Sequence, residues 1–258
     1  MEDLAGQRLD SVLLRAGDPT AASRLVQFAE TLGRMHALPI EPEPAQVYDL
    51  DRISDAWEIE LDREDRTALN LTATAYTQGD VGPDNAMVVD DRVLLFDFEM
   101  GGTRHPLTDA VTWHMGFPFG RGTGAIPEDV RDQMDAAYEA ARGVAVETHD
   151  WGCAFIFQLL GRLGRFHEWE VLNEDFEWGA TTGRQRLLAL LAARPPESPL
   201  ARALDDLERR LREAWPGVAP TLPMYPAFVV GLFRGRSATS PTARSRWPHA
   251  DGFFVASR

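Results

Sequence analysis

Apolar side chains recur along most of the chain at the three- and four-residue intervals of an amphipathic helix. In residues 21–38, Asp18 or Thr20 is expected to cap the helix and the proline-rich run LPIEPEP to end it. Its buried face is predicted to hold Leu25, Phe28 or Ala29, Leu32, and Met35 or His36. Similar patterns predict helices from Pro127 to about Val146, Trp151 to about Phe166, Gly183 to Leu191 and Leu200 to Ala214. The chain is therefore predicted to be mainly helical.

Two shorter runs, AMVVD at 86–90 and RVLLFDFE at 92–99, are rich in residues typical of strands. Asp90 and Asp91 between them predict a tight turn, so the two runs form a hairpin directly after the loop at residues 78–85. Helices together with one short hairpin predict an α+β fold. No internal repeat is present in the sequence.

Polar side chains gather around this hairpin. Asp80 and Asn85 lie in the loop before it, and Asp97 lies at its end. Phosphoryl transfer needs such a set, because one carboxylate orients or deprotonates the acceptor hydroxyl while an amide and a second carboxylate hold magnesium on the nucleotide phosphates. The alternative is that Asp80 and Asn85 are ordinary turn residues, since both residue types favour turns.

The segments TQGDVGPDN and LLFDFE resemble the catalytic loop and the metal-binding strand of the aminoglycoside phosphotransferase family, which are kinase-like small-molecule phosphotransferases. LGRMHAL before them and HPLTDAV after them are similar to two further segments of that family, in the same order. The resemblance covers residues 1 to about 225. It implies a protein-kinase-like C-terminal lobe with a short catalytic β-hairpin, ATP or GTP as phosphoryl donor, Mg²⁺, and a hydroxyl-bearing small molecule such as an aminoglycoside-like antibiotic or a metabolite.

Carried over to this sequence, the resemblance makes Asp80 the catalytic base and makes Asn85 and Asp97 the magnesium ligands. Asp109 in HPLTDAV would tie down the catalytic loop, and Glu99 would be a supporting acid beside the metal or the substrate.

Two departures from the family pattern concern Gln78 and the start of the chain. Gln78 stands where the family usually has a histidine that supports the loop. The opening MEDLAGQRLDSVLL resembles the hinge between the two lobes, and the family's glycine-rich turn and phosphate-binding lysine, which precede such a hinge, are not in these 258 residues. Met1 is then an internal methionine taken as a start, or the gene is truncated, or the chain works without ATP. We expect this chain alone to be inactive in phosphoryl transfer.

Two other functions fit the same residues. One is a non-enzymatic protein, similar to a pseudokinase, that binds a small molecule in an acidic cleft. The other is a metal-dependent hydrolase that uses Asp80 and Asp97, which is the less favoured because no histidine flanks the pair. The substrate and the oligomeric state are left open by the sequence.

The formal net charge of −14 argues against a nucleic-acid partner, favours solubility, and would attract cationic small molecules. All 26 basic residues are arginine, which excludes a Walker-type phosphate loop because that loop requires lysine. A single cysteine, Cys153, and an acidic N-terminus without a long apolar run predict a cytoplasmic protein with no membrane span. Residues 226–258 hold five arginines and one acid and predict a peripheral or disordered basic tail.

Overall fold

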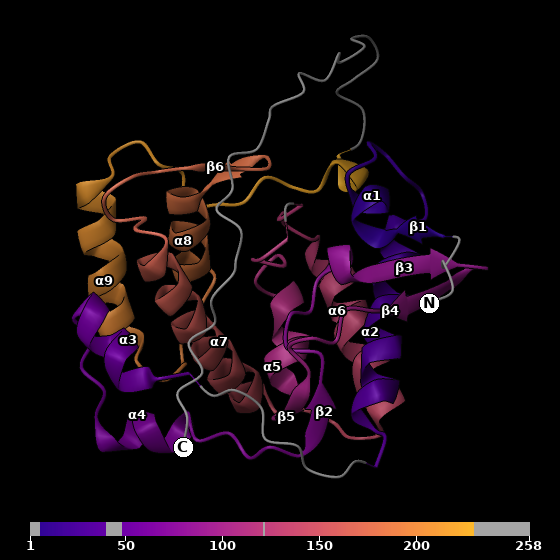
Figure 1. The fold of residues 1–258 in the computed structure, drawn as a ribbon, viewed down its shortest axis with the longest axis horizontal. Helices are drawn as coiled ribbons and strands as arrows, with labels where there is room; N and C mark the ends of the chain where they lie inside the picture. Colours follow the sequence, from indigo (N-terminus) through magenta and orange to yellow (C-terminus); the bar gives the residue numbers. More distant parts are fainter. Residues whose placement is uncertain (1–5, 40–47, 121, 230–258) are drawn as a thin grey trace, which may run out of the picture.

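Helices make up about 50% of the protein, whose computed structural model describes residues 6–39, 48–120 and 122–229 (Figure 1). The longest helices are α2 (Ala21–His36), α6 (Glu128–Arg142), α7 (Thr148–Glu168), α8 (Gly183–Ala192) and α9 (Ala201–Ala214). All five were predicted from the spacing of apolar residues, with ends that differ by a few positions. The predicted class, α+β and mainly helical with a short hairpin, is confirmed.

The helix α2 buries the face that its sequence predicts. Its buried residues are Ala21, Leu25, Phe28, Ala29, Leu32, Gly33 and His36. Neither predicted cap closes the helix, because the Asp18 carboxylate accepts the N–H and the hydroxyl of Thr20 at 2.9 and 2.7 Å instead of binding an amide of the first turn. Burial of the apolar face, with little help from capping, therefore stabilises α2.

Four short helices carry too few residues for their periodicity to be recognised in the sequence. They are α1 (Leu9–Leu13), α3 (Leu50–Trp57), α4 (Arg63–Ala68) and α5 (Leu107–Ala110). Two of them are fixed by their first turn: Asp49 accepts the Arg52 N–H at 3.0 Å, and Asp62 and Asp65 form a reciprocal capping box. The 3₁₀ turn Val111–Trp113 continues α5.

The residues that the structure describes also form three small antiparallel sheets. In the largest, β1 (Gln7–Arg8) and β4 (Arg92–Leu95) flank β3 (Ala86–Val89). The second pairs β2 (Ala75–Thr77) with β5 (Gly102–Arg104), and the third pairs β6 (Glu177–Trp178) with β7 (Thr181–Thr182).

The predicted hairpin is formed by β3 and β4, with Val89 opposite Arg92. Asp90 and Asp91 in its turn both have positive φ, of 46° and 63°, as a tight two-residue turn requires. The second predicted strand was too long: β4 ends at Leu95, and Asp97 has a φ of 61°, which no strand residue adopts.

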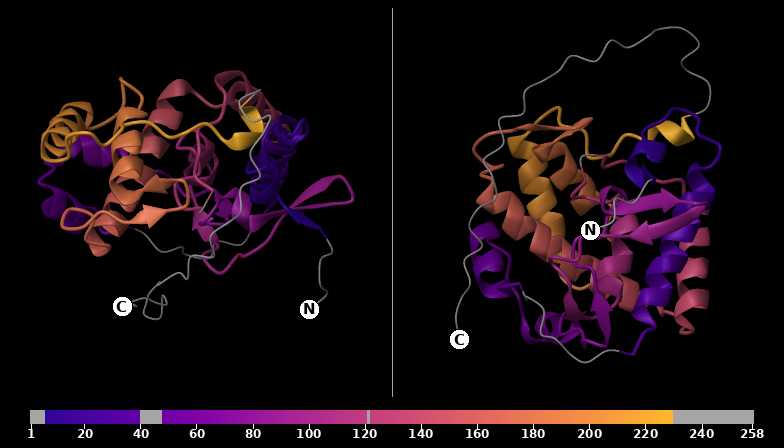
Figure 2. Two further views of the ribbon diagram at one scale, coloured as in Figure 1. Left: turned by 90° about the horizontal axis from the view of Figure 1, so that it is seen from above. Right: turned by 45° about the vertical axis from the view of Figure 1, so that its right-hand side comes forward.

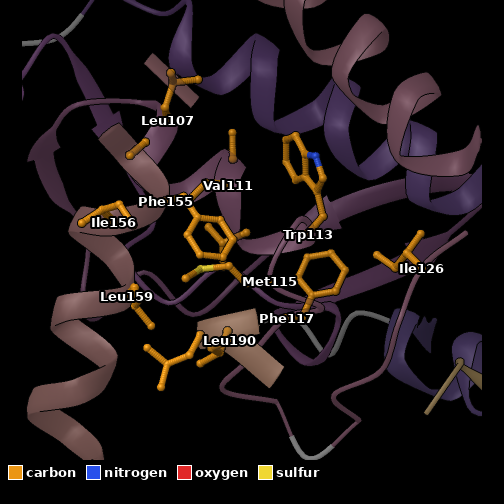
Figure 3. Packing of buried hydrophobic residues seen from close by; sticks show 14 of the residues in the cluster. Leu107, Val111, Trp113, Met115, Phe117, Ile126, Phe155, Ile156, Leu159 and Leu190 are labelled. Atoms are coloured by element: carbon orange, nitrogen blue, oxygen red, sulfur yellow. The ribbon is translucent and has the colours of Figure 1, made fainter. Parts of the chain in front are cut away.

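The elements divide into two groups with a shared core between them. In all views, α2 and α6 lie with the β3–β4 hairpin on one side, and α3, α7, α8 and α9 lie on the other (Figures 1 and 2). Phe155, Ile156 and Leu159 of α7 pack toward the segment after α5, which supplies Val111 and Met115 (Figure 3). This packing holds α5 in place, and α5 in turn carries Asp109.

The last described residues lie against the first helix. Pro226–Phe228 form a 3₁₀ turn in which the Pro226 carbonyl accepts the Gly17 N–H at 3.1 Å, and Ala227 is buried. Residues 230–258, which hold most of the predicted basic tail, and residues 1–5 lie outside the described residues. The division at residue 225 stays a prediction. Among the residues that the structure describes, no helix combines the length and the apolar character needed to cross a membrane.

The contact between α2 and α6 depends on a glycine. A Cβ at Gly33 would lie 2.6 Å from the Tyr138 carbonyl oxygen and 3.0 Å from the Ala141 Cβ. We predict that Gly33→Ala lowers the free energy of unfolding by about 1–2 kcal/mol, because the overpacking outweighs the gain in helix propensity. Gly152→Ala in α7 is the matched control, since its Cβ would meet nothing closer than 3.8 Å, and it should stabilise the protein by about 0.5–1 kcal/mol. Urea denaturation of both variants measures the difference, and a stabilised Gly33→Ala variant would contradict the tight packing.

Candidate functional site

The candidate site is built on a segment whose two ends are joined. Antiparallel pairing of β2 with β5 sets Tyr76 opposite Thr103, and the Thr77 hydroxyl donates to the Gly102 carbonyl at 2.8 Å. The loop, the 3₁₀ turn Pro83–Asn85 and the β3–β4 hairpin all lie between these two strands. The polar residues before and after the hairpin are therefore brought to one place by the backbone.

Gly79 sets the direction of the loop. Its φ is +86°, and a Cβ there would collide with the Met100 carbonyl oxygen, so only glycine fits. Asp80 follows directly and is partly buried. The Asn85 side-chain amide donates to the Asp80 carbonyl at 2.9 Å and to its Oδ2 at 3.3 Å. Asn85 thus fixes both the backbone and the carboxylate of Asp80.

Asp97 lies beside Asn85 at the end of the hairpin. The Phe96 N–H donates to the Asn85 carbonyl at 3.1 Å, which places the next residue, Asp97, just past Asn85. The Asp97 side chain is exposed. Gln78, which is fully buried, donates its side-chain amide to the carbonyl oxygens of Phe96 and Asp97. Gln78 therefore links the loop to the end of β4, and its role in supporting a catalytic loop stays a prediction.

Asp109 holds the backbone of the loop. Its carboxylate, 1% exposed, accepts the N–H of Gln78 at 2.6 Å and the N–H of Gly79 at 3.1 Å. His36 Nε2 is 3.4 Å from the same carboxylate, and His36 Nδ1 is 2.9 Å from the Tyr138 hydroxyl. Burial raises the pKa of Tyr138 well above its ordinary value, so its hydroxyl keeps its proton and can donate to Nδ1. This chain of contacts ties the loop to α2, α5 and α6.

Glu99, the proposed supporting acid, lies apart from these contacts. Its side chain is exposed, and among the described residues no hydrogen bond or ion pair joins it to Asp80, Asn85 or Asp97. A role for Glu99 stays a prediction.

Asp84 is a residue of the site that the sequence did not single out. It is half-buried, and a Cβ at Gly120 would lie 3.2 Å from its Oδ1. Burial raises the pKa of the Asp84 carboxyl, and the carboxylates of Asp80 and Asp10 raise it further. Asp84 differs from an ordinary turn residue because the loop that contains Gly120 buries it. The contact joins residues far apart in the chain, so no local sequence pattern reveals it.

Asn85 and Asp97 offer too few ligands to hold a metal ion by themselves, but they suit a metal ion that is already bound to a nucleotide. Within the described residues, no group of three or more histidine, cysteine or acidic side chains is close enough to hold a metal ion. The Asn85 amide nitrogen is engaged by Asp80, which leaves its oxygen, together with the Asp97 carboxylate, as two hard oxygen donors. Magnesium prefers oxygen ligands and completes its octahedron with water and phosphate oxygens. Asn85 and Asp97 therefore fit magnesium carried on a nucleotide.

Comparisons with known proteins give structural matches alone, since no family model and no curated protein matches the sequence. The choline kinase LicA from Streptococcus pneumoniae aligns at 14% identity and a TM-score of 0.46, over 68% of this chain and 64% of that one. A choline/ethanolamine kinase family protein from Mesorhizobium loti gives 16% and 0.48, over 81% and 74%. An aminoglycoside-3'-phosphotransferase of type VIII gives 17% and 0.45, over 63% and 67%.

These three proteins are kinase-like phosphotransferases, the class that the sequence resembles. The chain spans just under two thirds of the length of the Streptococcus choline kinase, and identity is low throughout. At TM-scores below 0.5, the functional assignment is left to the geometry of the site.

The Asp109 contacts predict a local effect on the loop. In Asp109→Asn, one carboxylate oxygen becomes an amide nitrogen that cannot accept from Gln78 or Gly79, and we expect a loss of about 1.5–3 kcal/mol of stability. Hydrogen exchange at these two backbone amides should become faster than in the wild type. Asp90→Asn in the hairpin turn is the control and should leave both rates unchanged. Undiminished protection of both amides in Asp109→Asn would contradict this anchoring role.

The raised pKa of Asp84 predicts a pH-dependent effect on stability. The folded protein binds the Asp84 proton more tightly than the unfolded chain does, so this residue lowers stability as pH rises above the ordinary aspartate value of 3.8 and keeps it lower at neutral pH. Asp84→Asn should therefore raise the melting temperature at pH 7, and the gain should shrink as the pH falls toward 4. The exposed Asp132→Asn is the control. A gain that does not depend on pH would exclude the titration of Asp84 as its cause.

Proposed function

We propose that this protein is a small-molecule phosphotransferase that moves the γ-phosphoryl group of ATP or GTP to a hydroxyl group. The observation that carries the proposal is the joint placement of Asp80, Asn85 and Asp97 at one end of the hairpin, on a loop that the buried Asp109 holds. The buried Asp109 carboxylate fixes the backbone of the loop that carries Asp80 and Asn85. Such an anchor is not required if these two residues only form a turn.

Asp80 is the base in this proposal. Within the described residues, its Oδ2 accepts a hydrogen bond from Asn85 and its Oδ1 accepts none. Oδ1 can therefore accept the proton of an acceptor hydroxyl, while the Asn85 amide keeps the carboxylate in one orientation. Orientation of the nucleophile is the main task of such a base, because positioning supplies much of the rate in phosphoryl transfer.

Asn85 and Asp97 would hold Mg²⁺ through the amide oxygen and the carboxylate. When bound, the magnesium nucleotide supplies the phosphoryl group and neutralises charge on its phosphate oxygens. Gln78 supports this pair, because it holds the carbonyl of Asp97 from the loop side.

Phosphate contacts from this sequence have to come from arginine and from backbone N–H groups, since the 258 residues include no lysine. We propose that nucleotide bound to these residues alone is poorly held in line, so that turnover by the chain by itself is slow. The acceptor is a small molecule with a free hydroxyl group, of the antibiotic-like or metabolite kind.

The test separates the two proposed roles. Magnesium-dependent ATP consumption is measured with aminoglycosides, choline and simple amino alcohols, and binding of MgADP is measured by calorimetry. Asp80→Asn should lower turnover by about 10²–10⁴-fold and leave MgADP binding unchanged, because the base acts in the transition state. Asp97→Asn should weaken MgADP binding as well as turnover.

Two control variants should change turnover little or not at all. Gln78→His, which installs the residue usual in the resembling family, should change turnover little. The exposed Asp132→Asn should have no effect. Turnover that survives both Asp80→Asn and Asp97→Asn would refute the proposal, and MgADP binding that Asp97→Asn leaves unchanged would refute the metal role of Asp97.

A further inference from the structure

Arg162, in the middle of α7, is a charged residue that has no hydrogen-bond or ion-pair partner among the residues that the structure describes. Its side chain is 1% exposed and is among the largest fully buried side chains of the molecule. Its Nε and Nη2 atoms are buried and make no hydrogen bond. No ion pair within 4.0 Å involves it among the residues that the structure describes. A buried cation without hydrogen bonds is costly, so its presence calls for a reason.

The second fully buried arginine, Arg186 in α8, shows what a structural arginine looks like in this protein. Its guanidinium donates to the Thr181 hydroxyl at 2.7 Å and to the carbonyl oxygens of Trp178, Pro118 and Gly120 at 2.6, 3.2 and 2.9 Å. Four acceptors satisfy it. The fold can therefore satisfy a buried guanidinium, and within the described part of the chain it does not do so for Nε and Nη2 of Arg162.

The surroundings of Arg162 connect it to the candidate site. The carboxylates of Asp80 and Asp109 both act on its charge, and the ring of Phe119 lies on the face of its guanidinium. Burial lowers the pKa of Arg162 to about 10, so the group stays charged at neutral pH. Phe119 covers the plane of the guanidinium and is itself only partly buried.

The two unpartnered nitrogens form one recognition edge. In a guanidinium, Nε–H and the adjacent Nη2–H point in parallel, with the spacing of two oxygens of a carboxylate or a phosphate. An edge of this kind, which has no hydrogen-bond partner among the described residues and whose charge is influenced by the proposed base Asp80, matches an anion with two oxygens.

We propose that Arg162 binds an anionic group of the acceptor substrate, a carboxylate or a phosphate ester, and so positions the hydroxyl of the same molecule at Asp80. This inference rests on the proposed function, because it takes Asp80 as the point where the hydroxyl lies. It names the class of acceptor: a small hydroxy compound that carries an anion.

The position of α7 favours the acceptor over the nucleotide as the source of the anion. Asn85 and Asp97, the proposed magnesium ligands, lie on the hairpin beside α2. Figure 1 shows α7 on the other side of α5, with α3, α8 and α9. Arg162 thus belongs to a helix that lies across α5 from the hairpin that carries the proposed metal pair. The net charge of −14 does not oppose this assignment, since a single desolvated arginine dominates at short range.

The experiment measures binding to the full chain without nucleotide, by calorimetry and thermal shift. Two pairs of probes differ by one anionic group: L-homoserine against 3-amino-1-propanol, and glycerol 3-phosphate against glycerol. We expect the member with the added anionic group to bind at least about tenfold more tightly than its counterpart without that group in at least one pair, and the preferred pair identifies the anion as carboxylate or phosphate.

Three variants assign the preference to Arg162. Arg162→Met should abolish it, and it should leave the ligand-free protein at least as stable as the wild type, because an unpaired buried charge is replaced by an apolar side chain of similar length. Arg162→Lys keeps the charge but loses the two-pronged edge, so it should retain only a weak preference. Arg165→Met is the control: it removes the same charge three residues further along α7, where Arg165 pairs with Glu168, and it should leave the preference intact.

Three results would overturn the inference. They are the absence of any anion preference in the wild type, a preference that persists in Arg162→Met, and a loss of MgADP affinity in Arg162→Met that would move the anion to the nucleotide. Failure of the proposed function is seen separately, as turnover that does not depend on Asp80, because the binding measurements use neither nucleotide nor magnesium.

Discussion

The buried carboxylate of Asp109 is the group on which the candidate site depends. A carboxylate taken out of water is costly unless hydrogen bonds replace its hydration, and the N–H groups of Gln78 and Gly79 are the replacement that this structure provides. If the loop moved away, the charge would lose both donors. The position of Asp80 is therefore set by the energetics of a neighbouring residue, and its own side chain stays available for a ligand.

Local patterns in the sequence predicted the parts of the fold that are determined locally. The long helices follow from apolar spacing, and the hairpin follows from two strand-like runs around Asp90 and Asp91. The end of β4 was missed because alternation of apolar residues continues through Phe96 and Phe98, while the positive φ of Asp97 ends the strand. The helices α1, α3, α4 and α5 were missed because each is too short to display a period.

The candidate site was predictable as far as residue type and order allow. Asp80, Asn85 and Asp97 could be selected from the sequence, and the structure brings them together through contacts within one segment. Asp84 and Arg162 could not be selected, because each owes its environment to residues far away in the chain. Gly120 lies against Asp84, and Phe119 lies on Arg162, so burial of both depends on one distant loop.

The closure of β2 onto β5 has a consequence for the order in which the protein is made. The ladder joins Ala75 to Arg104, which lie closer in the sequence than α5 and α7 do, and pairings of shorter separation form faster than those between more distant segments. Synthesis proceeds from the N-terminus, so the segment from Ala75 to Asp109 leaves the ribosome before α7 exists. Phe155 and Leu159, which support the chain after α5, arrive later. A nascent chain therefore displays its polar residues in the right order first, and gains a rigid support for them only when its second half has been made.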